Sequence, residues 1–390
     1  MGCSMSTRPP KTKANFTTVF MLGMSVLPLS LNAMEYTAGF SIPVSVNYDS
    51  NIQMADSNNE ESVVFYNVIP RVNFVGSDGV NTINFNGSVL FQRSSDEEIS
   101  EDRKDPTLGL SWLRTFERGE FSLSTNYNKI STRVSEQRVT GQVFSDGSSI
   151  NRSYDATLRY LVSEKLSMST GLGYQENRFS GAGLDDFNSK NFNVRLNYLY
   201  SEKLTPFVQF SMSRFENETN TLINEIATGL NNNGTSVSRN LLVGFDYKAS
   251  PQLDYSVAVG MNRVSTAGNG WVGNASLNYV VDEKSSIAGS ISRNVTPSGL
   301  GGFLEVDNLL LSYRYDVNSK NHLGADANWS ITRDVNDSSF KRIGGFYGYD
   351  ISEDWGMRTY LQYRTLQAVG VDANAYLIGV SLSYNHPQLF

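Results

Sequence analysis

The residue types that most often carry out catalysis or bind transition metals are scarce in this chain. Its 390 residues include two histidines, His322 and His386, and one cysteine, Cys3. The histidines lie far apart in the sequence, both near the periplasmic end of the predicted strands, and Cys3 precedes the apolar stretch at the N-terminus. General-base catalysis and transition-metal binding need such residues in a cluster. The sequence therefore predicts no catalytic residues, no cofactor and no metal centre.

One acidic stretch of the sequence could instead form a site for a hard cation. Asp96, Glu97 and Glu98 are followed closely by Glu101 and Asp102. Carboxylates of this density could bind calcium or the cations that bridge lipopolysaccharide molecules. A run of charge is more often a solvated loop, and that is the interpretation adopted here.

Charged residues that alternate with apolar residues are the more informative set. Their alternation assigns them to the inner face of a barrel, where water surrounds them, because a charge facing lipid at mid-depth would cost about 2–4 kcal/mol. Mixed charges among Asn, Gln and Ser suit water and neutral or weakly charged polar cargo, whereas an interior filled by ion pairs would carry no cargo. The predicted lumen-lining residues are Arg71, Arg159, Arg195, Asp246, Lys248, Asp254, Arg314, Asp326, Arg358 and Arg364.

The strands that would position these residues are clearest between Tyr154 and Met212, where one unit occurs twice. Leu166 and Leu172 share one face of a strand, while Ser167 and Gly171 share the other. A period of two is typical of a β-strand with one apolar and one polar face. No helical segment is available to cover the apolar face, so we expect an all-β, closed, antiparallel up-and-down barrel with lipid outside and water inside.

About eighteen strands are expected, within a range of sixteen to twenty, without a plug domain. Short turns such as Ser163–Lys165 alternate with connections that are mostly longer. This alternation is typical of outer-membrane barrels with both termini in the periplasm. Val63–Phe74 is predicted as one strand and Ser94–Asp105 as a loop. Of the long connections, Ser131–Ser153 and Glu216–Thr235 are long enough to fold inward and narrow a pore.

The N-terminal segment is predicted to be a secretory signal peptide spanning residues 1–33, which leaves 34–390 as the barrel. Three basic residues, Arg8, Lys11 and Lys13, precede an apolar stretch that is too short to span a membrane as a helix. An N-terminal anchor helix is the alternative. The net charge is −7, and it becomes more negative once this basic segment is removed, which disfavours nucleic acid as a partner.

Aromatic residues and the C-terminus predict contacts with the membrane and with the barrel-assembly machinery. The chain ends on Phe390, and Tyr384 lies on the same strand face, which resembles a barrel-assembly signal. Outer-membrane lipid and lipopolysaccharide are the other expected partners. Rings near the short turns predict a periplasmic girdle, with ordinary strand propensity as the alternative: Phe116, Tyr160, Tyr198, Tyr200, Tyr247, Tyr279, Tyr315, Tyr349 and Trp355.

The hairpin sequences SYDATLRYLVSEKLSMSTGLGYQENRF and NFNVRLNYLYSEKLTPFVQFSMSRFENE resemble the β-barrel porin family of bacterial outer-membrane proteins. In that family, an aromatic-x-aliphatic-x-Tyr strand meets a Ser-x-Lys/Arg-Leu turn and returns as Ser-x-x-x-Gly-Tyr. The resemblance implies a bacterial outer-membrane location and no catalytic residues. Its members are often associated with exopolysaccharide export, which implies a passive conduit for a biofilm or capsule polysaccharide, with polysaccharide and periplasmic export proteins as partners.

Two other functions stay open. A general porin for small polar solutes would need a constriction with opposed acidic and basic clusters. A structural or adhesive barrel would have a closed interior filled by ion pairs, such as Arg159 or Arg195 with Asp246 or Asp254.

Overall fold

The computed structural model describes residues 34–139, 146–181, 183–217, 234–333 and 337–386, and one compact unit spans Tyr36–Phe390. The predicted signal peptide and Phe390 lie outside the described residues.

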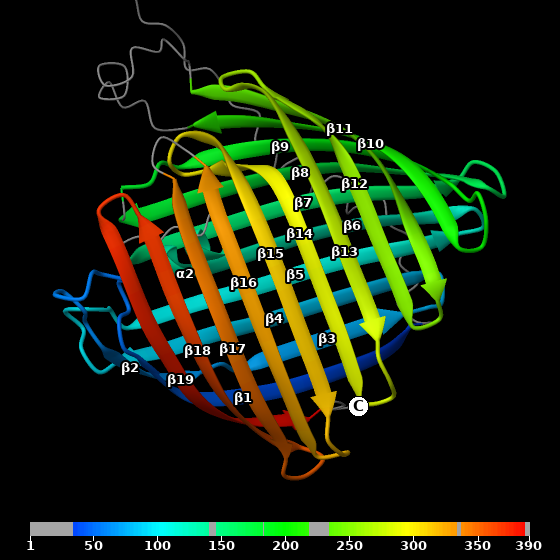
Figure 1. The fold of residues 1–390 in the computed structure, drawn as a ribbon. Helices are drawn as coiled ribbons and strands as arrows, with labels where there is room; N and C mark the ends of the chain where they lie inside the picture. The colour runs from blue at the N-terminus through cyan, green and yellow to red at the C-terminus, as the bar shows by residue number, and fades with distance from the viewer. Residues whose placement is uncertain (1–33, 140–145, 182, 218–233, 334–336, 387–390) are drawn as a thin grey trace, which may run out of the picture. The chain divides into compact units, whose positions relative to one another are not determined.

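Strands dominate the described chain and run in sequence order around one sheet (Figure 1). The sheet consists of β1 (Glu35–Asp49), β2 (Val63–Val68), β3 (Arg71–Ser77), β4 (Asn81–Ser94), β5 (Arg103–Phe116), β6 (Gly119–Ser131), β7 (Gly147–Leu161), β8 (Leu166–Gly181), β9 (Phe187–Tyr198), β10 (Leu204–Asn217), β11 (Thr235–Ser250), β12 (Leu253–Val264), β13 (Gly268–Val280), β14 (Ser285–Ser298), β15 (Gly302–Asp316), β16 (Asn321–Arg333), β17 (Ser338–Asp350), β18 (Trp355–Ala368) and β19 (Val371–His386). Neighbours pair antiparallel, and β1 pairs with β19, which closes the ring. This confirms the predicted antiparallel barrel.

The nineteen strands occupy eighteen positions around the ring, because β2 and β3 lie end to end as two halves of one interrupted strand. Both halves pair with β4, and the register is the same on either side of the break: Val68 faces Phe91, and Arg71 faces Ser88. The break falls at Pro70, which has no N–H to donate to the ladder. Its carbonyl still accepts a hydrogen bond of 3.2 Å from the Val89 N–H. The single predicted strand over this segment is therefore present with a local interruption.

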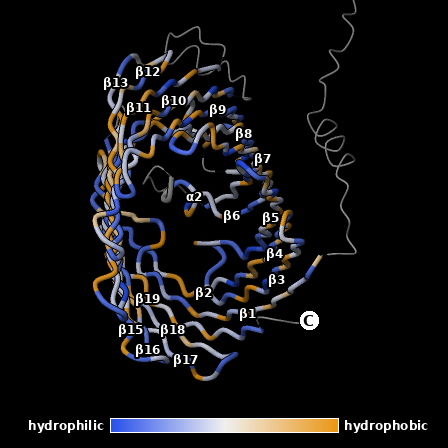
Figure 2. Tube along the Cα trace, turned by 90° about the vertical axis from the view of Figure 1, so that its right-hand side faces the viewer, coloured by the Kyte–Doolittle hydropathy of each residue, from blue (hydrophilic) through white to orange (hydrophobic). Residues whose placement is uncertain are grey.

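Apolar side chains cover the outside of the ring, and polar side chains face inward. On β1, Val44 and Val46 are each 46% exposed, whereas the neighbouring Asp49 on the other face is 4% exposed. Hydropathy alternates in the same way along the other strands (Figure 2). Exposed apolar residues on every second position have no layer packed over them, which is the pattern of a barrel surrounded by lipid.

The turns at one end of the barrel are uniformly short and have local side-chain support. In the β13–β14 turn, the Asp282 carboxylate accepts hydrogen bonds from the Lys284 and Ser285 N–H groups at 2.8 and 2.7 Å. Exposed rings surround this end, including Tyr198, Tyr200 and Trp355 at 46, 69 and 42%. Rings at the predicted girdle positions therefore do lie on the outer surface here; their contact with headgroups stays a prediction.

Connections at the opposite end are long only before β11. The β12–β13, β14–β15 and β18–β19 connections contain two or three residues, so the expectation of mostly longer loops is wrong for the strands that follow β11. Several strands also extend further toward this end than predicted. β5 begins at Arg103, within the predicted Ser94–Asp105 loop, because polar residues there still complete the backbone ladder with β4.

One helix, α2 (Thr132–Val139), follows β6 at this end, and Figure 2 shows it inside the ring. No helix in the described part of the chain is long and apolar enough to cross a membrane.

Candidate functional site

The continuous register allows one face of the sheet to be followed around the whole ring. All ten predicted lumen residues lie on the face that carries Asn47 and Asp49, opposite the exposed apolar residues. These are Arg71, Arg159, Arg195, Asp246, Lys248, Asp254, Arg314, Asp326, Arg358 and Arg364. Their role in solute transport stays a prediction. The contacts that they make differ greatly from one residue to the next.

One wall of the interior, from β9 to β12, carries a tight charged group. The Arg195 guanidinium donates to Asp246 at 2.6 Å and lies 3.5 Å from the centre of the Phe207 ring. Ser256 donates to the other Asp246 oxygen at 2.7 Å. Lys248 lies opposite Asp254 on β12, two residues along β11 from Asp246. Charge-assisted bonds to Asp246 on β11 thus join this strand to β9 and β12.

The other predicted residues are dispersed in smaller contacts. Arg159 pairs with Glu120 at 3.2 Å and not with Asp246 or Asp254. Arg314 lies 3.6 Å from Asp316. Two further pairs and one ring contact complete the set: Asp326 with Arg342 at 3.2 Å, Arg364 with Asp49, and Arg358 at 3.8 Å from the centre of the Phe346 ring.

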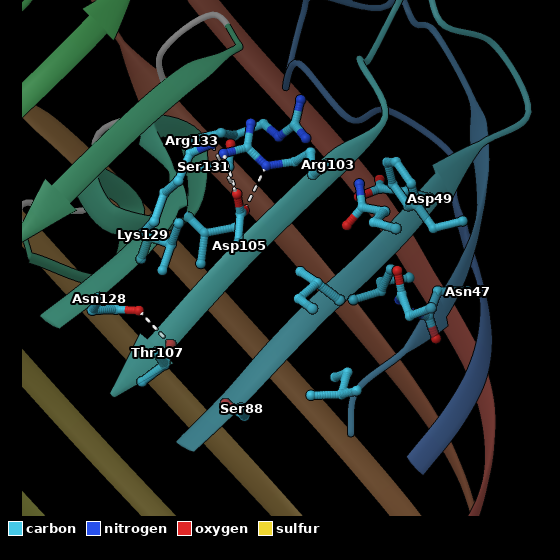
Figure 3. Close-up of a pocket in the computed structure, with 18 of the residues that line it drawn as sticks. Asn47, Asp49, Ser88, Arg103, Asp105, Thr107, Asn128, Lys129, Ser131 and Arg133 are labelled. Carbon is cyan, nitrogen blue, oxygen red and sulfur yellow. Dashed lines mark hydrogen bonds and ion pairs between the residues drawn. The ribbon is translucent and has the colours of Figure 1, made fainter. Parts of the chain in front are cut away.

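A cavity of about 770 Å³ lies between α2 and the wall formed by the first and last strands of the chain. Figure 3 shows Asn47, Ser88, Thr107 and Asn128 pointing into it. Hydroxyl and amide side chains outnumber charged ones in its lining, and Thr107 donates to Asn128 at 2.8 Å. The basic residues that line it are Arg71, Arg103, Lys129, Arg133, Arg342 and Arg364, and the acidic ones are Asp49 and Asp105.

Paired and unpaired charges are distributed unevenly in this cavity. Arg364 is buried against Asp49, and Arg103 donates to Asp105 at 2.8 Å. Arg71 is exposed to the interior and forms no ion pair among the described residues. A cation without a carboxylate partner, facing water inside a barrel, is the group with the largest capacity to attract a passing anion.

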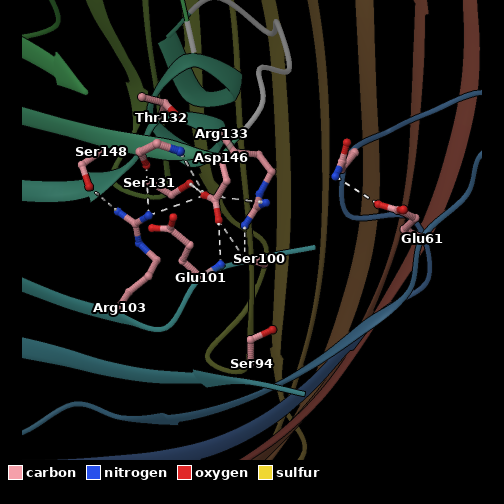
Figure 4. Close-up of polar contacts among 12 residues, drawn as sticks. Glu61, Ser94, Ser100, Glu101, Arg103, Ser131, Thr132, Arg133, Asp146 and Ser148 are labelled. Carbon is pink, nitrogen blue, oxygen red and sulfur yellow. Dashed lines mark hydrogen bonds and ion pairs between the residues drawn. The ribbon is translucent and has the colours of Figure 1, made fainter. Parts of the chain in front are cut away.

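The segment containing α2 is fixed to the wall through Asp146, as Figure 4 shows. One Asp146 oxygen accepts from the Ser100 hydroxyl at 3.0 Å and the Glu101 N–H at 3.2 Å, and the other accepts from the Ser131 hydroxyl at 3.2 Å. Arg103 on β5 and Arg133 on α2 approach the same carboxylate to 3.5 and 3.8 Å. We call these residues the docking cluster: Ser100, Arg103, Ser131, Arg133 and Asp146.

Two acidic groups of this segment have shifted pKa values in opposite directions. Burial alone would raise the pKa of Asp146, but Arg133, the Ser100 hydroxyl and Arg103 together hold it below its usual range. Burial raises the pKa of Glu136 on α2 to about 7. At neutral pH, Asp146 is therefore ionised, whereas Glu136 is close to half protonated.

The residues of the docking cluster were not among those predicted from the sequence. Arg103 and Asp105 are two residues apart on β5 and therefore share one face of the strand. Because this segment is predicted as a loop, that spacing is not recognised from the sequence. Arg133 and Asp146 lie in a long connection with no strand period, so only the fold brings them together. His322 contacts Asp316 at 2.7 Å and Asp350 at 2.9 Å, and Asp350 comes from the next strand, so the sequence alone does not reveal this pair of contacts.

The acidic stretch around Asp96 makes local contacts. Asp102 pairs with Arg93 at 3.0 Å, and Asp96 accepts from the Glu98 N–H at the same distance. Among residues that the structure describes, no group of three potential ligands is placed to hold a metal ion.

Comparison with known proteins places the fold. No protein-family model matches the chain, and no curated protein matches its sequence. Among solved structures, the chain is similar to Pseudomonas aeruginosa OpdO, with a TM-score of 0.51 and 11% identity over 91% of this chain and 98% of that one. A structure of OccK3 (OpdO) from the same organism gives a TM-score of 0.50, with 11% identity over 91% and 96%. At such identity the likeness concerns the fold. Because a closed barrel that is apolar outside and polar inside is how strands cross the outer membrane, the chain is an integral outer-membrane β-barrel.

Proposed function

We propose that this chain is a passive channel for small polar solutes, that it favours anionic ones, and that it is not an enzyme. The observation that carries the proposal is the cavity beside α2, where six basic and two acidic side chains stand among hydroxyl and amide groups. Its volume of about 770 Å³ is within the range of about 300–1,000 Å³ that binds small molecules. The α2 segment lies inside the ring and would narrow the passage, as a selective porin requires.

Charge around the cavity supports a preference for anions. Arg71 has no ion-pair partner among the described residues, and Arg342, which also lines the cavity, has a single described ion-pair partner, Asp326. A water-filled passage with low-dielectric walls concentrates ions of the opposite sign. Solutes bearing a carboxylate or phosphate would therefore enter more readily than cations of the same size.

Reversal potentials test this proposal. The protein, folded into a planar bilayer, should conduct, and a potassium chloride gradient should give a potential of the sign of chloride selectivity. Arg71→Glu should lower the chloride-to-potassium permeability ratio by several-fold, whereas Lys104→Gln on the outer face should leave it unchanged. Cation selectivity in the wild type would overturn the proposed preference, and a failure to conduct would favour a structural barrel.

Export of an exopolysaccharide remains a prediction from the sequence resemblance. The inward segment at α2 argues for small cargo, because a polymer needs an uninterrupted passage. A strain that lacks the protein should therefore secrete a normal amount of polysaccharide, and a fall restored by complementation would favour export instead.

A further inference from the structure

Basic residues project from the outside of the barrel near the long-connection end, on strands between β4 and β17. Eleven of them project from the apolar face of the strands in the half nearest these connections: Arg93, Lys104, Arg152, Arg178, Lys190, Arg214, Arg239, Arg263, Arg293, Arg333 and Lys341. The opposite end of the same surface is rich in aromatic rings. Lipid-facing charge is tolerated near the membrane interface and costly at mid-depth, so this level marks an interface.

The greatest excess of positive charge lies on β9 to β12. We call Lys190, Arg214, Arg239 and Arg263 the basic patch. Lys190 faces Arg214 in the register, and both reach one carboxylate, Glu216, at 3.3 and 2.8 Å. Two of the four cations therefore share the one acidic partner that the described residues give the patch.

Two members of the patch stand directly against each other. Arg239 and Arg263 are opposite residues of β11 and β12, both exposed. Neither forms an ion pair within the described ranges of the chain. Like charges directly opposite on neighbouring strands are destabilising. A bound anion that receives hydrogen bonds from both guanidinium groups would remove this repulsion.

An exposed apolar strip continues from the patch toward mid-depth. Met261, Leu241 and Val259 are 72, 54 and 55% exposed, and Trp271 beside Met261 is 54% exposed. The strip opens into a groove of about 470 Å³ between Trp271 and Trp329. Its floor contains the small residues Gly273 and Ala275, which leave the groove deep.

We propose that the basic patch binds a phosphate of an outer-leaflet glycolipid, lipopolysaccharide, whose acyl chains lie along the apolar strip and in the groove. The order of groups from the barrel rim inward, cationic and then apolar, matches the order of phosphate and acyl chain in such a lipid. A second copy of this chain presenting the same patch would bring cations against cations. The inference rests on embedding in the outer membrane and is independent of what the barrel conducts.

Binding of lipid A to delipidated protein tests the site, with the quenching of tryptophan fluorescence as the signal. Arg239→Gln/Arg263→Gln should raise the Kd for bis-phosphorylated lipid A by at least about tenfold, because two charge-assisted hydrogen bonds are lost. Arg239→Lys/Arg263→Lys should keep the Kd within a few-fold. The matched control, Arg93→Gln/Lys104→Gln, removes two cations at the same level on β4 and β5, away from the patch and the groove, and should leave the Kd nearly unchanged.

Several results would overturn the proposal. One is equal affinity of the wild type for phosphorylated and dephosphorylated lipid A. Another is an equal loss of affinity in the patch and control variants, which would indicate diffuse charge alone. A third is an oligomer of the wild type, seen by sedimentation without lipid, that the patch variant dissociates, because the face would then join copies of this chain. Heat-modifiable mobility on gels verifies that each variant is folded.

Discussion

At the scale of residues, the account depends most on Asp146, which joins four separate parts of the chain. It accepts from the β4–β5 connection and from the end of β6, and it approaches Arg103 and Arg133. Removing one member of a buried charged cluster leaves the others without a partner, which costs more than the pair itself contributes. Asp146 therefore decides whether the α2 segment stays against the wall.

Asp146→Asn should release the α2 segment and raise both the mean single-channel conductance and its fluctuations. The amide keeps the shape but loses the negative charge that Arg103 and Arg133 approach. Single-channel recordings in planar bilayers would measure this. Asp56→Asn, the same change at an exposed loop position, serves as the control and should leave the trace unchanged. Identical traces for both variants would show that Asp146 does not hold the segment.

The pKa of Glu136 predicts that docking of α2 depends on pH. This pKa is raised to about 7 from its usual 4.5, so its contribution to docking is fully present below pH 4.5 and is lost as pH rises through about 7. The pKa of Asp146 is lowered from 3.8, so its contribution is lost as pH falls below that value. Docking should be firmest at about pH 4–5. Conductance fluctuations should rise between about pH 4.5 and 7 in the wild type and stay flat over this range in Glu136→Gln; a persistent rise in the variant would exclude Glu136 as the cause.

At the scale of elements, strand type and order were predictable because the alternation is strong. Leu166 and Ser167 differ in polarity, and their strand has a short turn at its end, so both period and register were evident. Two features were not. The extension of β5 to Arg103 depends on pairing with β4, which a polar sequence does not reveal. The sequence of α2 has no apolar helical period that would predict a helix, and its position depends on contacts that form only in the folded barrel.

Pro70→Val should fuse β2 and β3 into one continuous strand. The register is the same on both sides of the break, and the Val89 N–H already donates to the carbonyl of residue 70. The new N–H would face the Val89 carbonyl in return. Hydrogen exchange followed by NMR should show the new amide as strongly protected as that of Val68. Rapid exchange at position 70 would mean that the break between β2 and β3 has a cause other than the missing N–H donor.

At the scale of the whole molecule, the closed ring, its apolar exterior and its polar interior could be predicted, because all three follow from the two-residue period. The pairing of Arg195 with Asp246 could be named only as one possibility, since their strands are separated by β10 and no local pattern joins them. The cavity beside α2 could not be predicted, because its walls come from both ends of the chain. Solute preference is a property of this assembled space.

The central claim, an aqueous interior that attracts anions beside a lipid-covered exterior, is tested most directly by thiol labelling at two adjacent residues. Ser88 lines the cavity opposite Arg71, and Val89 faces outward. In outer membranes, Ser88→Cys should react with water-soluble methanethiosulfonates, several-fold faster with an anionic than with a cationic reagent, and Val89→Cys should react with neither. Equal reaction at both positions, or faster reaction of the cationic reagent at position 88, would contradict the account.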